Sequence, residues 1–316
     1  MIKILGSGKF LPKHILSNQD LESIVDTSDE WITKRTGISS RHVVTSESVA
    51  HMAIEASVLA LKNADIASSE IDLVICGTLG GDFVLPSVAC LVAGHFDLKI
   101  PAFDINAACS GYVYALDVAV AYITSGKAEK VLLVGVDNMS RYVDYTNRNT
   151  CVLFGDGAGA LVLEKGSQLK AIKLTSQGGA DLMNIPNSQG NAPFLQKYDL
   201  EPYLYMDGPE VYKFAIKALE DQVRDVVAMA GLDIKDIDWL LPHQANFRII
   251  ETATKSLGIN MDKVLSNIKD CGNTSTACLP SLLHDGFACG KFKKGDIIVM
   301  CTFGGGLTTG AAVLEI

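Results

Sequence analysis

The chain of 316 residues lacks several features that would assign it to a specialised class. Its eight cysteines are scattered and form no C-x-x-C pair, unlike the dense framework of a small secreted disulfide protein. No run approaches the roughly 20 apolar residues that a membrane span requires. The N-terminal stretch MIKILGSGKFLPKH has no sustained apolar region of the kind found in signal peptides. We therefore expect a soluble protein of the reducing cytoplasm.

Positive charge is also scarce. The chain has 27 Lys and Arg against 36 Asp and Glu, which gives a formal net charge of -9. This balance argues against a protein that tracks nucleic acid, because such proteins need a positive field along the phosphate backbone. Binding to an acidic partner would require a local basic patch. With 48% hydrophobic and 20% charged residues, the chain can bury a sizeable core, and extended disorder is excluded.

Short apolar strands alternate with amphipathic helices along the chain, which predicts α/β layers. The expected strands are Ile71–Cys76, Ala102–Ile105, Val131–Val136, Ala158–Glu164, Ile237–Leu241, Ile297–Thr302 and Gly310–Leu314. The expected helices are 47–63, 109–124, 209–230, 246–257 and 277–289. No linker rich in Pro, Gly or Ser divides the chain, so we expect two halves that share an interface.

The two halves resemble each other in sequence. Ile71-Asp72 is echoed by Ile237-Asp238, and Val131–Val134 by Ile297–Met300, both at an offset of 166 residues. We interpret this as an internal duplication, with one half at 1–165 and the other at 166–316. The same offset carries Cys109 onto Ser275, and carries Gly77, just past a strand, onto His243. Open α/β sheets place their functional sites at such strand ends.

Cys109 is a candidate nucleophile. It follows the strand Ala102–Ile105 and small residues, and an apolar-periodic helix begins near it. The positive end of a helix dipole favours the thiolate, which is the nucleophilic form of cysteine. The alternative is a buried structural cysteine, the usual state of a free thiol.

Three further features follow predicted strands or turns. His243 comes after an apolar strand and a proline, where it could point into a cleft or be an ordinary loop histidine. Asn273 in CGNTSTA could be a turn residue or a donor to a developing oxyanion. Phe303 and the glycines 304–306 follow a buried strand, where backbone N–H groups could approach a ligand or simply form a tight turn. The pattern of a P-loop is absent.

Taken together, these segments are much more specific than each is alone. The order AACSG, PHQAN, GNTS and FGGG resembles β-ketoacyl-acyl-carrier-protein synthase III of type II fatty-acid synthesis. The segments 26–38 (DTSDEWITKRTGI) and 147–160 (NRNTCVLFGDGAGA) extend this resemblance over essentially the whole chain. The resemblance implies an α/β thiolase-like fold with two pseudo-equivalent halves in a five-layered α-β-α-β-α arrangement, and a homodimer.

The resemblance also implies a reaction. Cys109 would accept an acyl group, typically acetyl, from acyl-coenzyme A, and malonyl on acyl carrier protein would then lose CO₂ and attack that acyl thioester. His243 and Asn273 would donate hydrogen bonds to the enolate oxygen. The amides of Cys109 and Gly305 would form a second oxyanion hole. No metal and no resident cofactor are expected, since acyl-coenzyme A is a substrate.

Binding residues follow from the same resemblance. Trp31 and Arg148 would sandwich the adenine of coenzyme A, because indole and guanidinium planes stack on a purine, and Arg35 would contact a phosphate. The remaining candidates are Thr27, Gly208, Asn246 and Phe247 for coenzyme A, Leu85, Leu153, Phe154, Met206 and Phe303 for the acyl pocket, and Lys213, Arg248 and Lys255 for docking of the acidic carrier protein.

The chain departs from the family pattern at three places. Leu85 stands where many relatives have a Phe that crosses the dimer interface and limits the acyl pocket. Asp207 and Pro209 flank Gly208 where Ala and Asn are typical, and 178–205 matches poorly. These departures affect the acyl primer and leave the reaction class unchanged.

Three alternative functions could use some of the same residues. A relative from specialised metabolism could transfer an acyl group to another acceptor, but the presence of Asn273 favours decarboxylating elongation. A thiolase would need a second catalytic cysteine, and Cys301 does not lie in the corresponding motif. A silent subunit would have lost the nucleophile, whereas Cys109 is present.

Overall fold

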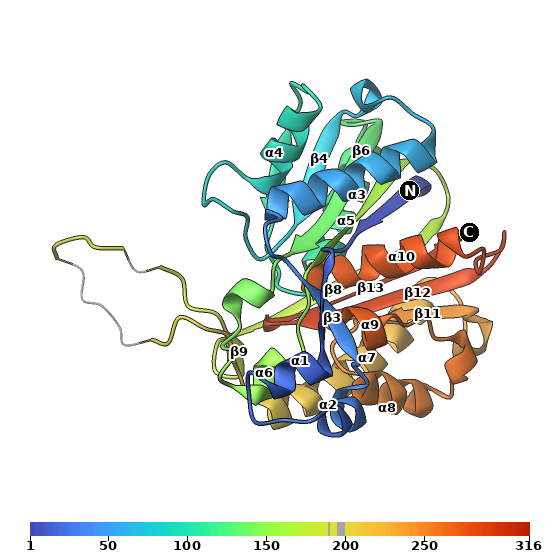
Figure 1. Ribbon diagram of the computed structural model, residues 1–316. Coiled ribbons are helices and arrows are strands. Elements are labelled where there is room, and N and C mark those ends of the chain that lie inside the picture. The colour runs from blue at the N-terminus through green and yellow to red at the C-terminus, as the bar shows by residue number, and fades with distance from the viewer. Residues whose placement is uncertain (189, 195–199) are drawn as a thin grey trace.

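The computed structural model describes residues 1–188, 190–194 and 200–316, and most of its strands belong to two sheets. The first sheet has the strand order β1-β7-β6-β4-β5 (Figure 1). Strand β4 pairs in parallel with β5 and β6, and β7 runs antiparallel to β6 and β1. The strands are β1 (Ile2–Phe10), β4 (Leu73–Gly77), β5 (Ala102–Ile105), β6 (Lys130–Asp137) and β7 (Gly157–Lys165).

The second sheet has the order β11-β12-β13-β8. Strand β11 pairs in parallel with β12, and β13 runs antiparallel to β12 and β8. Its strands are β8 (Leu169–Gly179), β11 (Trp239–Pro242), β12 (Ile297–Gly304) and β13 (Gly306–Glu315). Order and direction repeat those of β1, β7, β6 and β4, so the predicted pseudo-equivalent halves are confirmed. The exact boundary between 165 and 166 stays a prediction.

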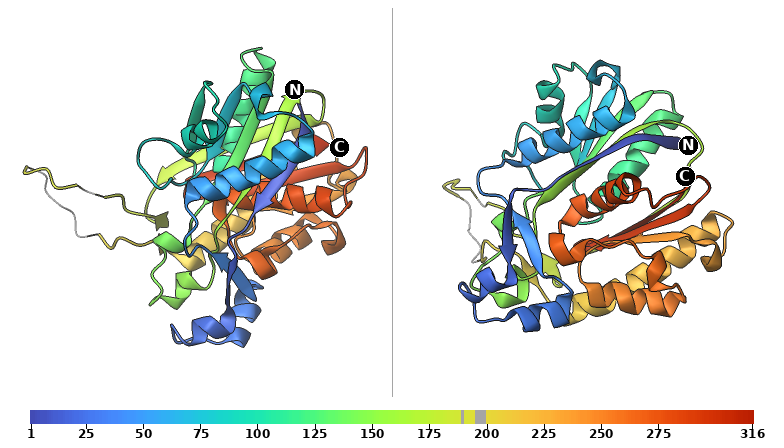
Figure 2. Two further views of the ribbon diagram at one scale, coloured as in Figure 1. Left: turned by 45° about the horizontal axis from the view of Figure 1, so that its top comes forward. Right: turned by 45° about the vertical axis from the view of Figure 1, so that its right-hand side comes forward.

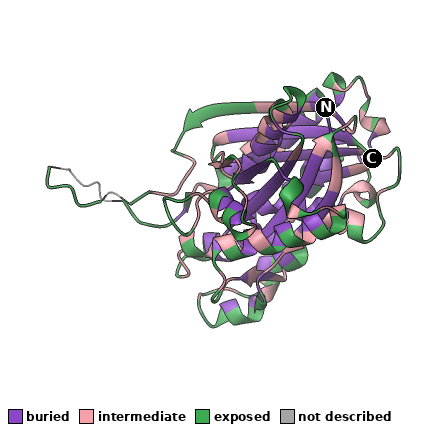
Figure 3. Ribbon diagram, turned by 90° about the horizontal axis from the view of Figure 1, so that it is seen from above, coloured by how far each residue is buried: buried purple, intermediate pink, exposed green. Residues whose placement is uncertain are grey.

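In the described ranges, six helices that pack on the two sheets complete five layers. α3 and α4 pack on the outer face of the first sheet, α7 and α8 pack on that of the second, and α5 and α10 lie between the two sheets (Figure 2). The central strands of both sheets are therefore buried, whereas the second half of β8 is exposed and the outer helices expose one face (Figure 3). The helices are α3 (Val49–Ala64), α4 (Val88–His95), α5 (Gly111–Thr124), α7 (Gly208–Met229), α8 (Phe247–Leu257) and α10 (Cys278–Ala288).

The predicted helix positions agree with the structure to within two residues at each end, and capping residues explain several of these ends. Ser48 caps α3 by accepting a hydrogen bond from the N–H of His51. Asp207 caps α7 and is followed by a proline in the first turn, where its missing N–H costs nothing. Asn246 caps α8, which ends at Gly258 in the left-handed conformation.

Smaller elements form a cap over one end of the two sheets. A separate hydrophobic cluster that includes Leu21, Ile32, Met139 and Val152 holds this cap together. Its elements are β2 (His14–Ser17), α1 (Asn18–Glu22), α2 (Asp29–Thr36), β3 (Ser40–Val43), α6 (Arg148–Cys151), β9 (Met183–Asn184) and β10 (Tyr205–Met206).

The remaining elements are short. They are α9 (Ile268–Cys271) and the 3₁₀ turns Ser68–Glu70, Ser140–Tyr142, Ile234–Asp236, Met261–Lys263 and Ser275–Ala277. In the described ranges, none of the helices combines the length and the apolar character that crossing a membrane requires.

Candidate active site

A cavity of about 1140 Å³ lies between the cap and the ends of the two central helices. Cys109, His243 and Asn273 all line it, together with Phe303 and the glycines 304–306. The structure thus brings together the three residues that the sequence predicted as the catalytic set, from three segments that lie 134 and 30 residues apart along the chain.

Cys109 lies just before α5, which begins at Gly111. The preceding residue, Ala108, has a φ of 49°, in the left-handed region, so the backbone turns sharply between β5 and the helix. Gly304 permits close contact with this turn, because a Cβ placed on it would lie 2.7 Å from the amide nitrogen of Cys109. The nucleophile is therefore held against the end of β12.

The thiol of Cys109 is buried, with only 8% of the residue exposed. Burial raises the pKa of Cys109 to about 12, although the Oγ–H of Ser275, 3.3 Å from Sγ, favours the thiolate. The sequence analysis expected the helix dipole to favour the thiolate, and burial acts in the opposite direction. With a pKa of about 12 the thiol is protonated at neutral pH.

Ser275 is the residue onto which the 166-residue offset carries Cys109. Its φ of 52° also lies in the left-handed region, and its hydroxyl donates to Cys109 Sγ. Equivalent positions of the two halves therefore meet where the two inner helices begin, with Cys109 lining the cavity and Ser275 buried behind it.

His243 follows β11 and is fixed by its backbone, whose N–H donates to the carbonyl of Cys301 at 2.8 Å. The ring is buried, with 1% of the residue exposed, and it packs edge-on against Phe303 at a centroid distance of 5.2 Å. Burial lowers the pKa of His243 to about 3, so the imidazole is neutral at physiological pH. Its Nδ1 lies 2.9 Å from Sγ of Cys278.

Asn273 is fixed in position and in orientation. Its N–H donates to the carbonyl of Leu153 at 2.8 Å, and its own carbonyl accepts from the N–H of Gly155 at 3.0 Å. The side-chain Oδ1 accepts from the N–H of Ser275 at 2.9 Å. Because a backbone N–H can only donate, this contact identifies the oxygen of the amide, and the NH₂ group is the end left for the cavity.

Asp137 is a residue that the sequence analysis missed. It ends β6, is 1% exposed, and accepts hydrogen bonds from Thr78 and Leu79 on one side and from Thr276 on the other. Burial raises its pKa in spite of these donors. It ties the turn that carries Ser275 to the loop after β4. The feature of the sequence that could have identified Asp137 is a carboxylate directly after an apolar strand.

Arg41 was also missed. It is fully buried, and its guanidinium donates to the carbonyls of Leu16 and Val152 and to Oδ1 of Asn18. In the described ranges no carboxylate pairs with it, and burial lowers its pKa to about 10, so it stays charged at neutral pH. Through Val152, Arg41 holds the segment in which the next residue, Leu153, accepts the hydrogen bond from the backbone N–H of Asn273.

The predicted coenzyme A residues divide into two groups. Trp31, Arg35, Gly208 and Asn246 line the cavity. Thr27 and Phe247 do not, and Phe247 packs instead on Gly37 at the end of α2.

Arg148 lies outside the cavity lining as well, in a separate hollow beside Asp26. Its guanidinium carbon is 5.2 Å from the ring centroid of Trp31, while that of Arg35 is 4.3 Å away. Two stacking contacts of about 3.5 Å each would be needed to hold a purine between Trp31 and Arg148. The two side chains therefore have to separate before an adenine can enter, and the sandwich stays a prediction.

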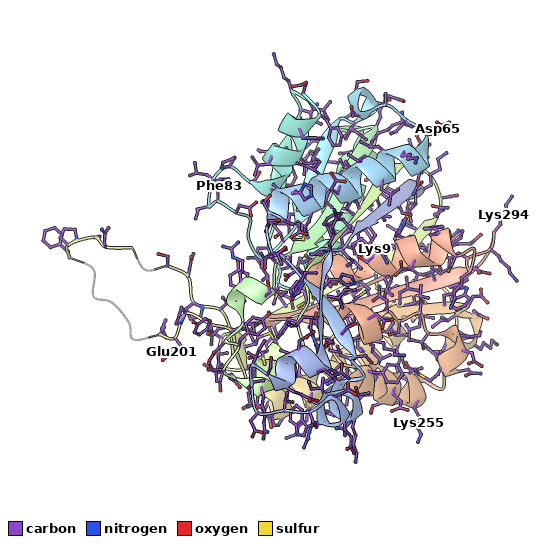
Figure 4. All side chains as sticks on the ribbon, in the orientation of Figure 1. Lys9, Asp65, Phe83, Glu201, Lys255 and Lys294 are labelled. Atoms are coloured by element: carbon purple, nitrogen blue, oxygen red, sulfur yellow. The ribbon has the colours of Figure 1, made fainter. Side chains whose placement is uncertain are left out.

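Four of the five predicted acyl-pocket residues line the cavity, and these are Leu153, Phe154, Met206 and Phe303. Leu85 does not, and it is 81% exposed. Its neighbour Phe83 projects from the edge of the molecule (Figure 4). A role for Leu85 in the pocket would thus need a second copy of the chain to cover it.

The predicted docking residues lie on the outer helices of the second half. Arg248, in the first turn of α8, lines the mouth of the cavity, and its guanidinium lies over the ring of Tyr212 at 5.9 Å. Lys213 on α7 pairs with Glu210 at 2.7 Å. Lys255 is exposed in the last turn of α8 (Figure 4) and is not one of the residues that line the cavity.

Two duplicated α/β halves that bring a buried cysteine, a neutral histidine and an oriented asparagine to one cavity define a condensing enzyme of the thiolase fold. The profile of 3-oxoacyl-[acyl-carrier-protein (ACP)] synthase III matches residues 103–181, and the profile of its C-terminal part matches 227–316. The β-ketoacyl-[acyl-carrier-protein] synthase III of Aquifex aeolicus is 44% identical over 99% of both chains, and that of Clostridium acetobutylicum is 42% identical over 99% of this chain and 98% of the relative.

Solved structures lead to the same family. The crystal structure of 3-oxoacyl-[acyl-carrier-protein] synthase III from Aquifex aeolicus superposes with a TM-score of 0.94 at 43% identity and covers all of both chains. The priming β-ketosynthase of the R1128 polyketide pathway superposes with a TM-score of 0.92 at 31% identity. The chain belongs to the β-ketoacyl-[acyl-carrier-protein] synthase III family and is an acyltransferase of the condensing type.

Proposed function

We propose that this enzyme starts fatty-acid chains by condensing acetyl from acetyl-coenzyme A with malonyl-acyl carrier protein, through an acyl group bound to Cys109. The observation that carries this proposal is the arrangement of the cavity: one buried thiol faces the same space as two neutral side chains that can donate hydrogen bonds. Such a set suits formation of a thioester followed by stabilisation of an enolate.

In the first half-reaction, Sγ of Cys109 attacks the thioester carbonyl of the acyl donor. The bond between that carbonyl and coenzyme A breaks, and the proton of Cys109 leaves with the coenzyme A thiol. The reaction exchanges one thioester for another, so the thiolate is needed only transiently. The hydroxyl of Ser275 stabilises it at that moment by its hydrogen bond to Sγ. The amides of Cys109 and Gly305 would bind the oxyanion of the tetrahedral intermediate.

In the second half-reaction, the malonyl thioester loses CO₂ and its carbonyl oxygen takes up the negative charge of the enolate. Nε2–H of His243 and the NH₂ group of Asn273 would donate to that oxygen. The enolate carbon then attacks the acyl group on Cys109, a carbon–carbon bond forms, and the released thiolate takes up a proton. Loss of one oxyanion donor typically lowers the rate ~100- to 1,000-fold.

The outer part of the cavity supports the assignment of coenzyme A. Trp31 and Arg35 from α2 and Arg248 from α8 bring one aromatic face and two positive charges to its lining. Phosphates bind guanidinium groups strongly, and a purine stacks on indole. Thr27, Arg148, Gly208, Asn246 and Phe247 are further candidates here, with Arg148 released from Asp26 on binding. We propose no resident cofactor, since the acyl donor is a substrate.

We further propose that acyl carrier protein docks at Arg248, with Lys213 and Lys255 on the adjoining face of α7 and α8. The enzyme is acidic overall, so an acidic partner needs this local positive field. Arg248 is best placed, because it stands at the mouth of the cavity and has no carboxylate partner in the described residues.

A homodimer is supported by the first sheet. Strand β5 is at its edge and leaves one row of backbone groups unpaired within the chain. In the loop between β4 and α4, the consecutive residues Phe83, Val84 and Leu85 are 60%, 98% and 81% exposed. We propose that a second copy covers this apolar segment and that Leu85 then reaches the partner's acyl pocket. The eight free thiols support the reducing cytoplasm as its compartment.

The test separates the half-reactions. Purified protein is exposed to acetyl-coenzyme A, its mass is measured, and malonyl-acyl carrier protein is then added and acetoacetyl product quantified. Cys109→Ala should gain no acetyl mass, whereas His243→Ala and Asn273→Ala should gain it and lose condensation. Labelling of Cys109→Ala at another cysteine would overturn the assignment of the nucleophile. Equal loss of both half-reactions in the other two variants would overturn their role as enolate donors.

A further inference from the structure

Cys278 contacts the predicted catalytic histidine and has no role in the mechanism above. It is the first residue of α10, it is 1% exposed, and its Sγ lies 2.9 Å from Nδ1 of His243. The two residues are separated by 35 positions in the chain, so this contact is a tertiary one between the end of β11 and the beginning of an inner helix.

The direction of this hydrogen bond follows from the groups around it. Burial raises the pKa of the Cys278 thiol and lowers that of His243 to about 3, so both groups are neutral. A neutral thiol sulfur is a weak acceptor, whereas the unprotonated nitrogen of imidazole accepts readily. The proton between the two side chains therefore belongs to sulfur.

We propose that Cys278 is a positioning residue that fixes the tautomer of His243: its S–H donates to Nδ1 and thereby keeps the ring proton on Nε2. The proposal rests on the role proposed above for His243 as a donor to the enolate. No hydrogen bond to Nε2 is formed by the part of the chain that the structure describes, and His243 lines the cavity. With the proton held on Nε2, the ring presents a donor to that space.

The opposite tautomer would present a lone pair. If Nδ1 carried the proton, Nε2 would face the enolate oxygen with its own electron pair, and decarboxylation would be opposed where it should be favoured. In the neutral ring the choice between the two nitrogens is set by the hydrogen bond that one of them makes. Cys278 supplies that bond from a rigid position at the start of α10, and Phe303 packs against the ring from another side.

The first test reads the tautomer directly. Protein with ¹⁵N-labelled histidine is examined by NMR at neutral pH, and the His243 signals are assigned from the spectrum of His243→Gln. The expected result is a protonated Nε2 and an unprotonated Nδ1 in the wild type, with the same pattern in Cys278→Ser, because a hydroxyl also donates. In Cys278→Ala the two tautomers should both be populated. A protonated Nδ1 in the wild type would overturn the proposal.

The second test measures catalysis in the two half-reactions. Cys278→Ala should be acetylated within twofold of the wild-type rate, while kcat for condensation should fall about tenfold with KM for malonyl-acyl carrier protein unchanged, since a net hydrogen bond of this kind changes an equilibrium by about that factor. Cys278→Ser should restore condensation. Cys76→Ala removes an equally buried thiol from β4, away from the ring, and controls for the loss of volume.

The outcomes separate the two proposals. Normal condensation by Cys278→Ala, or a serine variant as slow as the alanine variant, would overturn the role of Cys278. Normal condensation by His243→Ala would overturn the proposed function of His243 and leave the NMR result to decide the tautomer. If Cys278→Ala does not fold, the wild-type and serine spectra still decide.

Discussion

The neutral state of His243 has a consequence for stability that can be measured without any substrate. Burial lowers the pKa of His243 from 6.5 to about 3 in the folded protein. Below pH 6.5 the unfolded chain binds a proton at this residue and the folded protein does not. Protons therefore favour the unfolded state, so the contribution of His243 to stability is fully present above pH 6.5 and is lost as the pH falls toward 3.

The size of the effect follows from the same two values. One pKa unit corresponds to about 1.36 kcal/mol. At about pH 5, roughly 1.5 units below the pKa in the unfolded chain, the free energy of unfolding should therefore be about 2 kcal/mol lower than at neutral pH. Buried carboxyl groups act in the opposite direction. The pKa values of Asp137 and Asp156 are raised by burial, so these groups take up protons in the folded state before they do in the unfolded state. The pH dependence of the wild type alone is thus a sum of opposing contributions.

A comparison with His243→Gln isolates the histidine. Glutamine has no charged form, and whatever it costs in packing is the same at both pH values. The free energy of unfolding in urea is measured for both proteins at about pH 7.5 and about pH 5, at one protein concentration. The loss on acidification should be about 2 kcal/mol larger for the wild type. The exposed His14→Gln controls for the removal of a histidine as such.

Equal losses on acidification in the wild type and in His243→Gln would refute this reasoning. They would mean that the ring takes up a proton in the folded state near its ordinary pKa, and so that water reaches it. The condensation rate would then depend on this ionisation near pH 6, whereas a pKa of about 3 predicts that His243 contributes no ionisation between about pH 5 and pH 8.

Further predictions concern the contacts around the nucleophile, the cap and the dimer. Gly304→Ala should lower the rate of acetylation about 100-fold with the fold intact, because the new Cβ would displace the amide of Cys109. Mass spectrometry after brief exposure to acetyl-coenzyme A measures this rate, and acetylation of the variant at the wild-type rate would contradict the prediction. Arg41→Met should destabilise the protein by about 3 kcal/mol, since it leaves the carbonyl of Val152 and two other acceptors unpaired, and Arg41→Lys should recover only part of that stability. Urea unfolding measures the change, and a loss below about 1 kcal/mol in Arg41→Met would contradict the prediction. Leu85→Asp should give monomers in sedimentation experiments, and an unchanged dimer would place the interface elsewhere.

Much of the architecture could be predicted because its signals are local. The predicted inner helix 277–289 is α10, and the strands Val131–Val136 and Ile297–Thr302 lie within β6 and β12. The equal offset of 166 was informative because it depended on the spacing between strands, which a duplication preserves. The same offset makes Ser275 the equivalent of Cys109, and in the structure the two side chains are hydrogen-bonded.

Strand β1 was missed because its signal is not local. The sequence IKILGSGKF contains two glycines, which are poor strand residues, and their reason becomes apparent only in three dimensions. A Cβ on Gly8 would lie 2.1 Å from the carbonyl oxygen of Ala56, so α3 packs directly on the backbone of this strand. Strand β8 was missed for a related reason, since its second half is half-buried or exposed and shows no apolar pattern.

The effect of burial on Cys109 could not be predicted from the sequence, for a general physical reason. A helix N-terminus can be recognised in a sequence, but the loss of solvation depends on every segment that covers the site. Here the covering segments include the end of β12 and the turn at Ser275, from the other half of the chain. The helix dipole is worth typically 0.3–1 kcal/mol near the surface, whereas complete burial shifts a pKa by several units, or roughly 1.36 kcal/mol for each unit.

The raised pKa of Cys109 is compatible with catalysis because of what the site has to protect. The enolate formed on decarboxylation would be protonated by water or by any acidic group nearby, so a productive site must be dry and must offer donors that do not release protons easily. When the enolate forms, Cys109 already carries the acyl group and has no proton to give, and a neutral imidazole with a pKa of about 3 and an amide release protons poorly. A charged imidazolium would stabilise the enolate more strongly, but it would also protonate the carbon that has to attack the acyl group. Burial of all three groups therefore makes the thiol less reactive in the resting enzyme, and in exchange it keeps the carbanion available for the carbon–carbon bond.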